Sequence, residues 1–144
     1  MIKKIKHSRK SRNGKILGDY EGELNSKKLP HGKGKCHFED GLFYQGFWKN
    51  GKRDGKGKMT LPNNDSYEGD WKNDMPNGKG QSILGGDVYD GDFKDGDRHG
   101  NGTYVWLKEE NKYEGEWKNN NRDGYGKYSE KNGNVYEGLW KNDK

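Results

Sequence analysis

Several short stretches of the 144-residue chain carry residue types that ligand binding or catalysis uses. Residues 51–58 are rich in glycine and lysine, as phosphate-binding loops are, but Gly-x4-Gly-Lys followed by Ser or Thr occurs nowhere in the chain. Asp90, Asp92, Asp95 and Asp97 are as dense as the ligands of a calcium loop, yet the glycine and the closing glutamate of such a loop are missing. We therefore expect neither a phosphate loop nor a calcium site.

The histidines and the single cysteine also lack the partners that catalysis or metal binding would need. His31 and His99 each directly precede a Gly-x-Gly sequence, at a position where equivalent stretches carry Asp54 or Asn77, so the position calls for turn chemistry. Cys36 has no second cysteine with which to form a disulfide or a cysteine-rich zinc site. We expect no catalytic residue, no metal, no cofactor and no enzymatic activity.

Positive charge is concentrated in residues 1–19, which have a net charge of +6 in a chain of +5, so residues 20–144 carry −1. The basic residues of this segment are Lys3, Lys4, Lys6, Arg9, Lys10, Arg12 and Lys15. They predict either a flexible, solvated tail or a contact with an acidic membrane or microtubule surface. The near-neutral remainder argues against nucleic acid binding. No apolar run is typical of a signal peptide or a transmembrane segment, so we expect a cytoplasmic protein.

A repeat organises the rest of the chain. Six tyrosines lie 22 to 24 residues apart, each is followed two residues later by glycine, and a Gly-x-Gly sequence falls 11 or 12 residues after each of the first five. The six tyrosines are Tyr20, Tyr44, Tyr67, Tyr89, Tyr113 and Tyr136. A period of this length is typical of one supersecondary unit stacked on copies of itself. The aromatic content of 12%, gathered at the repeat positions, argues against disorder despite 35% charged residues.

Period-two alternation within each repeat predicts β-strands. Tyr67, Gly69 and Trp71 share one face, which we term the ring face, while Glu68 and Asp70 point to the opposite face. A polar turn then leads to a second strand that begins with Gly-x-Gly, so that each repeat is a β-hairpin. Glycines inside these strands leave room for rings to lie on bare backbone. The predicted fold is all-β, an elongated, single-layer, twisted antiparallel sheet of consecutive hairpins.

The pattern Tyr-x-Gly-x-Trp-x-x-Gly-x-x-x-Gly-x-Gly, present from Tyr44 to Gly57, resembles the MORN (membrane occupation and recognition nexus) repeat. The resemblance covers residues 20–144 as five repeats and a partial sixth, with Leu24 and Phe93 in place of tryptophan in two copies. It implies an elongated binding scaffold, often found in cytoskeletal, ciliary or membrane-associated assemblies, after a basic tail of residues 1–19.

The expected function is that of a protein-interaction scaffold, with a helix or extended segment of another protein bound in an aromatic groove. Lysines and acidic residues alternate between adjacent strands on the opposite face, so that face neutralises itself. The ring face is therefore the better candidate, and the third to fifth repeats are the richest in rings. The expected contact residues are Tyr67, Trp71, Tyr89, Phe93, Tyr104, Trp106, Tyr113, Trp117 and Tyr128. The alternative is a membrane or phosphoinositide-associated adaptor that acts through the basic tail.

Overall fold

The computed structural model of the protein describes the backbone of residues 2–8 and all of residues 18–144. All regular secondary structure in these residues is β-strand, and none of it is helix. The strands are β1 (Ile2–Ser8), β2 (Gly18–Leu24), β3 (Pro30–Phe38), β4 (Phe43–Lys49), β5 (Lys52–Thr60), β6 (Ser66–Lys72), β7 (Met75–Leu84), β8 (Asp87–Lys94), β9 (Asp97–Trp106), β10 (Asn111–Lys118), β11 (Asn121–Ser129) and β12 (Val135–Trp140).

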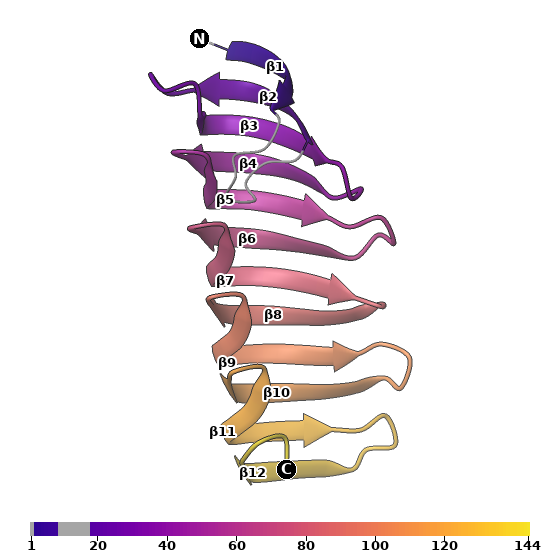
Figure 1. The fold of residues 1–144 in the computed structure, drawn as a ribbon. Helices are drawn as coiled ribbons and strands as arrows, with labels where there is room; N and C mark the ends of the chain where they lie inside the picture. The colour runs from indigo at the N-terminus through magenta and orange to yellow at the C-terminus, as the bar shows by residue number, and fades with distance from the viewer. Residues whose placement is uncertain (1, 9–17) are drawn as a thin grey trace. The chain divides into compact units, whose positions relative to one another are not determined.

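The chain forms two compact units, residues 1–75 and residues 76–144. In the first unit the strands β1 to β6 pair antiparallel in sequence order, and in the second unit β7 to β12 do the same (Figure 1). Each unit is a single open sheet of consecutive hairpins, which confirms the predicted fold class.

Strand β1 lies within the segment that the sequence analysis assigned to a basic tail. It pairs antiparallel with β2, with Ile2 opposite Glu23 and Ile5 opposite Tyr20. Lys3, Lys4 and Lys6 are therefore part of a strand of the sheet. The other basic residues named for this segment, Arg9, Lys10, Arg12 and Lys15, lie outside the described residues.

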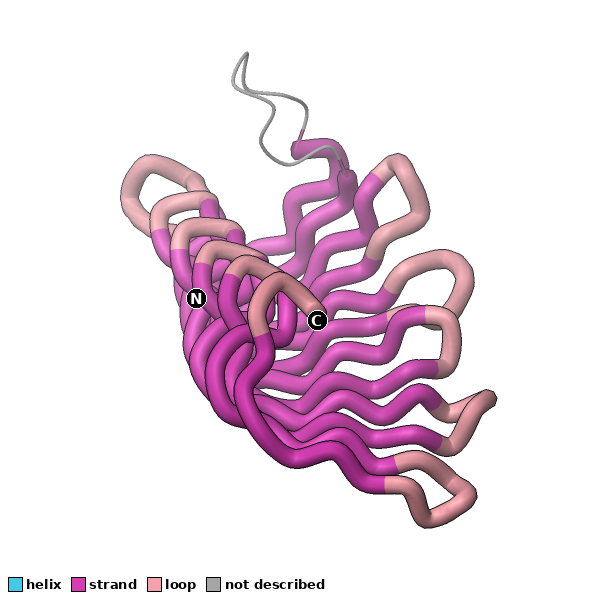
Figure 2. The backbone as a smooth tube through the Cα atoms, turned by 90° about the horizontal axis from the view of Figure 1, so that it is seen from below, coloured by secondary structure: helices cyan, strands magenta, loops and turns pink. Residues whose placement is uncertain are grey.

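The alternating sequence produces alternating burial. Along β4 and β10 the tyrosine and the tryptophan are buried, while the residues between them are partly or fully exposed. A β-bulge follows Gly22, Gly46, Gly91 and Gly115, where the register with the next strand shifts. Bulges bend a strand and increase its twist, and Figure 2 shows that the strands are bent.

The two positions of each Gly-x-Gly require glycine for different structural reasons. The first has a positive φ, for example 73° at Gly100 and 103° at Gly124, a conformation that residues with a Cβ rarely adopt. The second lies beneath a tyrosine ring. A Cβ added to Gly102 would lie 2.5 Å from Cε2 of Tyr89, and closer still to Cζ and Oη of that ring. The tyrosine rings therefore do lie on bare backbone.

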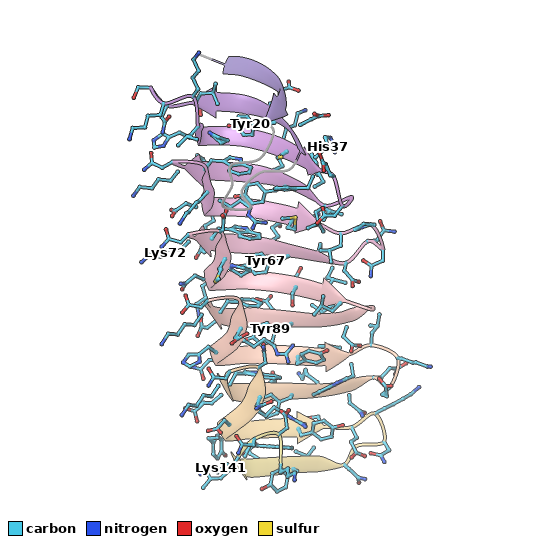
Figure 3. All side chains as sticks on the ribbon, viewed as in Figure 1. Tyr20, His37, Tyr67, Lys72, Tyr89 and Lys141 are labelled. Atoms are coloured by element: carbon cyan, nitrogen blue, oxygen red, sulfur yellow. The ribbon has the colours of Figure 1, made fainter. Side chains whose placement is uncertain are left out.

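The core is a row of edge-to-face aromatic rings. Tyr44 lies between Trp48 of its own repeat and Trp71 of the next, with ring centroids 5.0 and 5.2 Å apart and interplanar angles of 85°. Figure 3 labels Tyr20 and Tyr67, which lie on their strands in the first unit, and Lys72, the last residue of β6. Tyr89 and Tyr113 likewise contact a ring of their own repeat and a ring of the next, which explains why one hairpin needs its neighbours.

The polar atoms of these rings are hydrogen-bonded to backbone carbonyls. The Tyr44 hydroxyl donates to the carbonyl oxygen of Phe47 at 2.8 Å, and each of the other five repeat tyrosines bonds the residue three positions ahead in the same way. Trp48 Nε1 donates to the carbonyl oxygen of Gly34 at 3.0 Å, across the boundary between two repeats. Large rings can therefore be buried without leaving polar groups unsatisfied.

Candidate functional site

The nine ring-face residues expected to contact a partner fall into two groups. Six of them are 0 to 7% exposed and form the core: Tyr67, Trp71, Tyr89, Phe93, Tyr113 and Trp117. Tyr104, Trp106 and Tyr128 are partly exposed. The six buried rings offer little area to another molecule, so any contact on this face depends mainly on the other three.

These three rings join a fourth to form a cluster in the second unit. Tyr104 and Trp106 have ring centroids 4.5 Å apart, Trp106 and Tyr128 are 5.7 Å apart, and Tyr128 and Trp140 are 6.1 Å apart. All four are partly exposed, and we call them the open ring cluster. Within residues 18–75 of the first unit, the positions equivalent to Tyr104 hold no ring but smaller side chains that are buried. These residues are Cys36 and Met59.

Hydrogen bonds hold two of these rings at the hairpin end of the cluster. The Tyr104 hydroxyl donates to Asp87 Oδ2 at 3.1 Å, and Asn111 Nδ2 donates to the Tyr128 hydroxyl oxygen at 2.9 Å. Burial and the Asp87 carboxylate both raise the pKa of Tyr104, so the phenol stays protonated at neutral pH. These hydrogen bonds fix the orientation of the Tyr104 and Tyr128 rings.

Three arginines that the sequence analysis did not single out lie against the rings. Arg53, Arg98 and Arg122 each follow a repeat tyrosine by nine residues, and that recurrence was the signal available in the sequence. Each guanidinium lies over the tryptophan of the following repeat, a cation–π arrangement. The guanidinium carbons lie 4.8, 4.9 and 4.5 Å from the ring centroids of Trp71, Trp117 and Trp140 respectively. Arg122 also lies within 6 Å of Trp106 and Tyr128 in the open ring cluster.

Two of the arginines are clamped by an aspartate of the next repeat. Asp74 Oδ1 accepts from the Arg53 backbone N–H at 2.7 Å and from Nε at 3.2 Å, and the Asp74 carbonyl oxygen accepts from an Nη at 3.0 Å. Asp143 accepts three equivalent hydrogen bonds from Arg122: its Oδ1 accepts from the backbone N–H and from Nε, and its carbonyl oxygen accepts from an Nη. We call this arrangement the Arg–Asp clamp.

The remaining two repeat joints are built from proline and glycine. Pro30 and Pro76 occupy the position of the arginines, and their carbonyl oxygens accept from the N–H groups of Gly51 and Gly96 at 2.8 and 2.9 Å. Proline has no N–H, so the joint needs no side-chain acceptor, and glycine suffices where the other joints carry Asp or Asn. The chain therefore uses two kinds of joint between repeats.

The opposite face pairs charges across strands, as expected. Lys56 forms an ion pair with Asp70, and Lys79 forms one with Asp92. Burial alone would raise the pKa of Asp92, but hydrogen bonds from Lys79 and from the Asn101 N–H outweigh it and lower that pKa. Exposed pairs of this kind contribute at most about 1 kcal/mol each and leave little net charge to attract an anionic surface.

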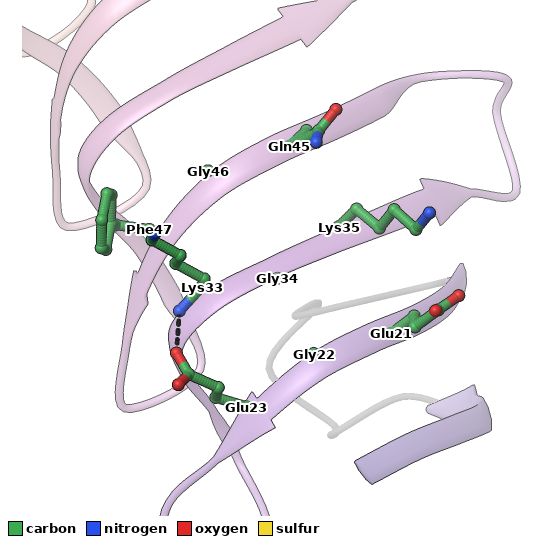
Figure 4. A pocket seen from close by; sticks show the side chains of 9 residues that line it. All are labelled: Glu21, Gly22, Glu23, Lys33, Gly34, Lys35, Gln45, Gly46 and Phe47. Atoms are coloured by element: carbon green, nitrogen blue, oxygen red, sulfur yellow. Dashed lines mark hydrogen bonds between the residues drawn. The ribbon is translucent and has the colours of Figure 1, made fainter. Parts of the chain in front are cut away.

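A hollow of about 440 Å³ lies in the first unit, over β2, β3 and β4 (Figure 4). Its charged lining residues are two acids and two lysines: Glu21, Glu23, Lys33 and Lys35. The Glu23 carboxylate accepts a hydrogen bond from the Lys33 N–H, and Lys33 Nζ lies 5.8 Å from the centroid of the Phe47 ring. Balanced charge and an internally paired carboxylate give this hollow no preference for an ion of either sign.

His31 and Cys36 have structural surroundings. His31 Nδ1 accepts a hydrogen bond from the Asn50 N–H at 3.2 Å, which supports the next turn. Cys36 is 0% exposed, and burial raises the pKa of its thiol to about 12, so it is neither ionised nor accessible to substrate. Among residues 18–144 no group of three or more His, Cys, Asp or Glu side chains could hold a metal ion.

Comparison with known families identifies the repeat. A sequence model of the MORN repeat matches residues 20–43, 44–66, 67–83, 89–106, 113–135 and 136–144, which together make up most of the chain. A comparison with individual curated proteins gave no match. MORN repeats are non-enzymatic modules that commonly serve protein or membrane interaction, and proteins that contain them are often cytoplasmic or membrane-associated. The described part of the chain has no helix of the length and apolarity needed to cross a membrane. The repeat pattern, the hairpin sheet and the match over all six copies agree, and the chain belongs to the MORN repeat family.

Proposed function

We propose that the protein is a non-enzymatic scaffold that binds a helix or an extended segment of another protein on the ring face of its second unit. The observation that carries this proposal is the open ring cluster, in which four rings remain partly exposed and three of them lie around the Arg122 guanidinium. Tyrosine, tryptophan and arginine are the side chains that most often dominate the binding energy of interfaces. The assembly we favour is cytoskeletal or ciliary, of the radial-spoke kind, by analogy with other MORN proteins.

Alanine substitution in the open ring cluster is expected to release the partner. Trp106→Ala and Tyr128→Ala each remove a partly exposed ring, and each should weaken binding about tenfold or more, since buried aromatic anchors cost upwards of about 1.4 kcal/mol when truncated. The measurement is quantitative affinity capture from cell extract with mass spectrometry, followed by titration calorimetry with the segment identified.

Tyr125→Ala is the matched control. Tyr125 lies on the same strand as Tyr128 but on the opposite face, is 53% exposed, and bonds Glu137 Oε1 at 2.7 Å. Partner recovery should be the same as with the unsubstituted protein. Recovery that survives both Trp106→Ala and Tyr128→Ala, or that falls equally with Tyr125→Ala, would rule out the ring face.

The second candidate is an adaptor that attaches to an acidic membrane or microtubule surface through residues 1–19. Its support is the concentration of seven basic residues in a segment with one acid, in a chain whose remainder is near neutral. Each basic residue close to an anionic lipid surface contributes about 1 kcal/mol, so several acting together would suffice for peripheral attachment.

Substitution of Arg9, Lys10, Arg12 and Lys15 with glutamine removes four charges and alters no residue of strand β1. If the basic segment carries attachment, co-sedimentation with phosphatidylserine vesicles or with microtubules should fall by roughly three orders of magnitude in affinity. The unsubstituted protein in high salt is the control, because screening should have the same effect. Sedimentation unaffected by both changes would exclude the second candidate.

A further inference from the structure

The three arginines of the ring face occupy equivalent seats that are not equally neutralised. Arg53 and Arg122 are held in the Arg–Asp clamp, with side chains about one-fifth exposed. At Arg98 the aspartate is replaced by Asn120. The Arg98 backbone N–H donates to Asn120 Oδ1 at 2.9 Å, and an Nη donates to the Asn120 carbonyl oxygen at 2.8 Å. The scaffold of the clamp is retained, but the carboxylate is absent.

This substitution leaves the Arg98 guanidinium short of a partner. Its Nε is buried and makes no hydrogen bond, and no carboxylate in residues 18–144 lies within ion-pair distance of it. The Asn120 side chain cannot rotate to offer Nε an acceptor, because its Nδ2 donates to Asp97 Oδ1 at 2.7 Å. A buried donor without an acceptor is costly, and a charged one more so.

The Arg98 guanidinium lies next to the open ring cluster. Its Cζ is 5.3 Å from the centroid of Tyr104, 4.9 Å from that of Trp117 and 5.9 Å from that of Tyr89. Rings supply part of the missing stabilisation by cation–π attraction, but they cannot accept the in-plane bond of Nε. A segment lying over Tyr104 and Trp106 would pass beside an arginine that lacks a carboxylate.

We propose that Arg98 selects the partner, by donating hydrogen bonds to the carboxylate of an aspartate or glutamate from the segment bound on the open ring cluster. This inference rests on the proposed function and specifies the chemistry of the partner: an apolar segment with an acidic side chain beside its aromatic anchors. Asn120 fills the place of Asp74 and Asp143, so the incoming carboxylate supplies the missing charge from the side of the open ring cluster, where the guanidinium lies against Tyr104. A carboxylate with one charge suits the seat better than a phosphate, since the carboxylate of Asp87 already bonds the hydroxyl of the adjacent Tyr104.

The test uses a display library of random 16-residue peptides, selected on the full chain and on three variants. Asn120→Asp supplies the missing carboxylate from within and should keep or raise the melting temperature, so a folding defect does not confuse the result. Asp143→Asn does the reverse at Arg122 and opens a second seat. Trp106→Ala reports whether the peptides bind on the ring face at all.

We expect peptides selected on the unsubstituted chain to be enriched in Asp or Glu at a fixed spacing from an apolar residue. A selected peptide should bind about tenfold more tightly than its Glu→Gln counterpart by fluorescence polarisation, as a charge-assisted bond predicts. With Asn120→Asp that ratio should fall close to one, and with Asp143→Asn a second acidic position should be enriched.

The failures are distinguishable. Peptides that depend on Trp106 but show no acidic preference, or keep it unchanged with Asn120→Asp, overturn the role of Arg98 and leave the proposed function standing. Peptides whose binding is indifferent to Trp106→Ala, or no selected peptides, overturn the proposed function and this inference with it.

Discussion

Replacing Gly102 with alanine is expected to lower the free energy of unfolding by about 3 to 5 kcal/mol, out of the roughly 5 to 15 kcal/mol typical of a domain. The added Cβ would lie 2.5 Å from Cε2 of Tyr89 and overlap Cζ and Oη as well, so the ring must leave its seat. Leaving it exposes a ring that is 1% accessible and breaks the hydrogen bond from its hydroxyl to the Asp92 carbonyl, which is 2.8 Å long. Urea denaturation followed by tryptophan fluorescence measures the loss.

Backbone conformation cannot account for this effect, because Gly102 does not have a positive φ and alanine suits a strand better than glycine does. Gly138→Ala is the matched control: a Cβ there lies 3.2 Å from Oη of Tyr136, a ring that is 52% exposed and free to move. It should cost less than about 1 kcal/mol. In a Tyr89→Leu background, Gly102→Ala should lose most of its cost, since the overlapping atoms are gone. Equal losses of unfolding free energy at Gly102 and Gly138 would show that the contact between the Tyr89 ring and Gly102 is not the cause.

Raising the pH should unfold the protein cooperatively between about pH 10.5 and 12. Burial raises the pKa of Tyr20 to about 12, and burial likewise raises the pKa values of Tyr44, Tyr67, Tyr89 and Tyr113 above the ordinary value near 10. Above pH 10 the unfolded chain releases phenolic protons that the folded chain retains, so stability is fully present below that pH and falls as pH rises. Five tyrosines together remove about 7 kcal/mol per pH unit, at about 1.4 kcal/mol each.

Circular dichroism and tyrosinate absorbance, recorded on the same samples, check this expectation. The strand signal and the tyrosinate absorbance of the five buried phenols should change together, because these phenols can ionise only when the sheet opens. Tyr89→Phe keeps the ring but removes one ionising group, and it should make the alkaline transition shallower. Tyrosinate absorbance from all five buried rings while the strand signal persists would contradict the expectation.

The sequence predicted the elements that depend on local pattern. Tyr67, Gly69 and Trp71 alternate with acids at period two, and the structure places them as a strand with its rings buried. The paired glycines predicted rings on bare backbone, and Tyr89 over Gly102 is such a contact. The MORN resemblance, drawn from the same residues, is confirmed over all six copies.

Contacts between repeats were less accessible to sequence reasoning. The hydrogen bond between Arg53 and Asp74 joins residues 21 positions apart. It forms because the pairing of β5 with β6 brings the turn of one repeat beside a strand of the preceding repeat. The partial exposure of Tyr104 depends on side-chain size at a position where Cys36 and Met59 are buried. Strand β1 has no alternating pattern, and its pairing depends on the available edge of β2. These features follow from packing between copies, which no single copy encodes.

The two kinds of joint restrict how such an array could grow or shrink in evolution. A repeat with arginine nine residues after its tyrosine must be followed by one that offers Asp or Asn, as with Arg98 and Asn120, whereas a repeat with Pro76 is followed by Gly96. A duplication or deletion that pairs an arginine repeat with a glycine repeat leaves the arginine backbone N–H without an acceptor, at a cost of about 1 to 3 kcal/mol. Repeats are therefore not interchangeable modules, and recombination would be expected to preserve them in matched pairs.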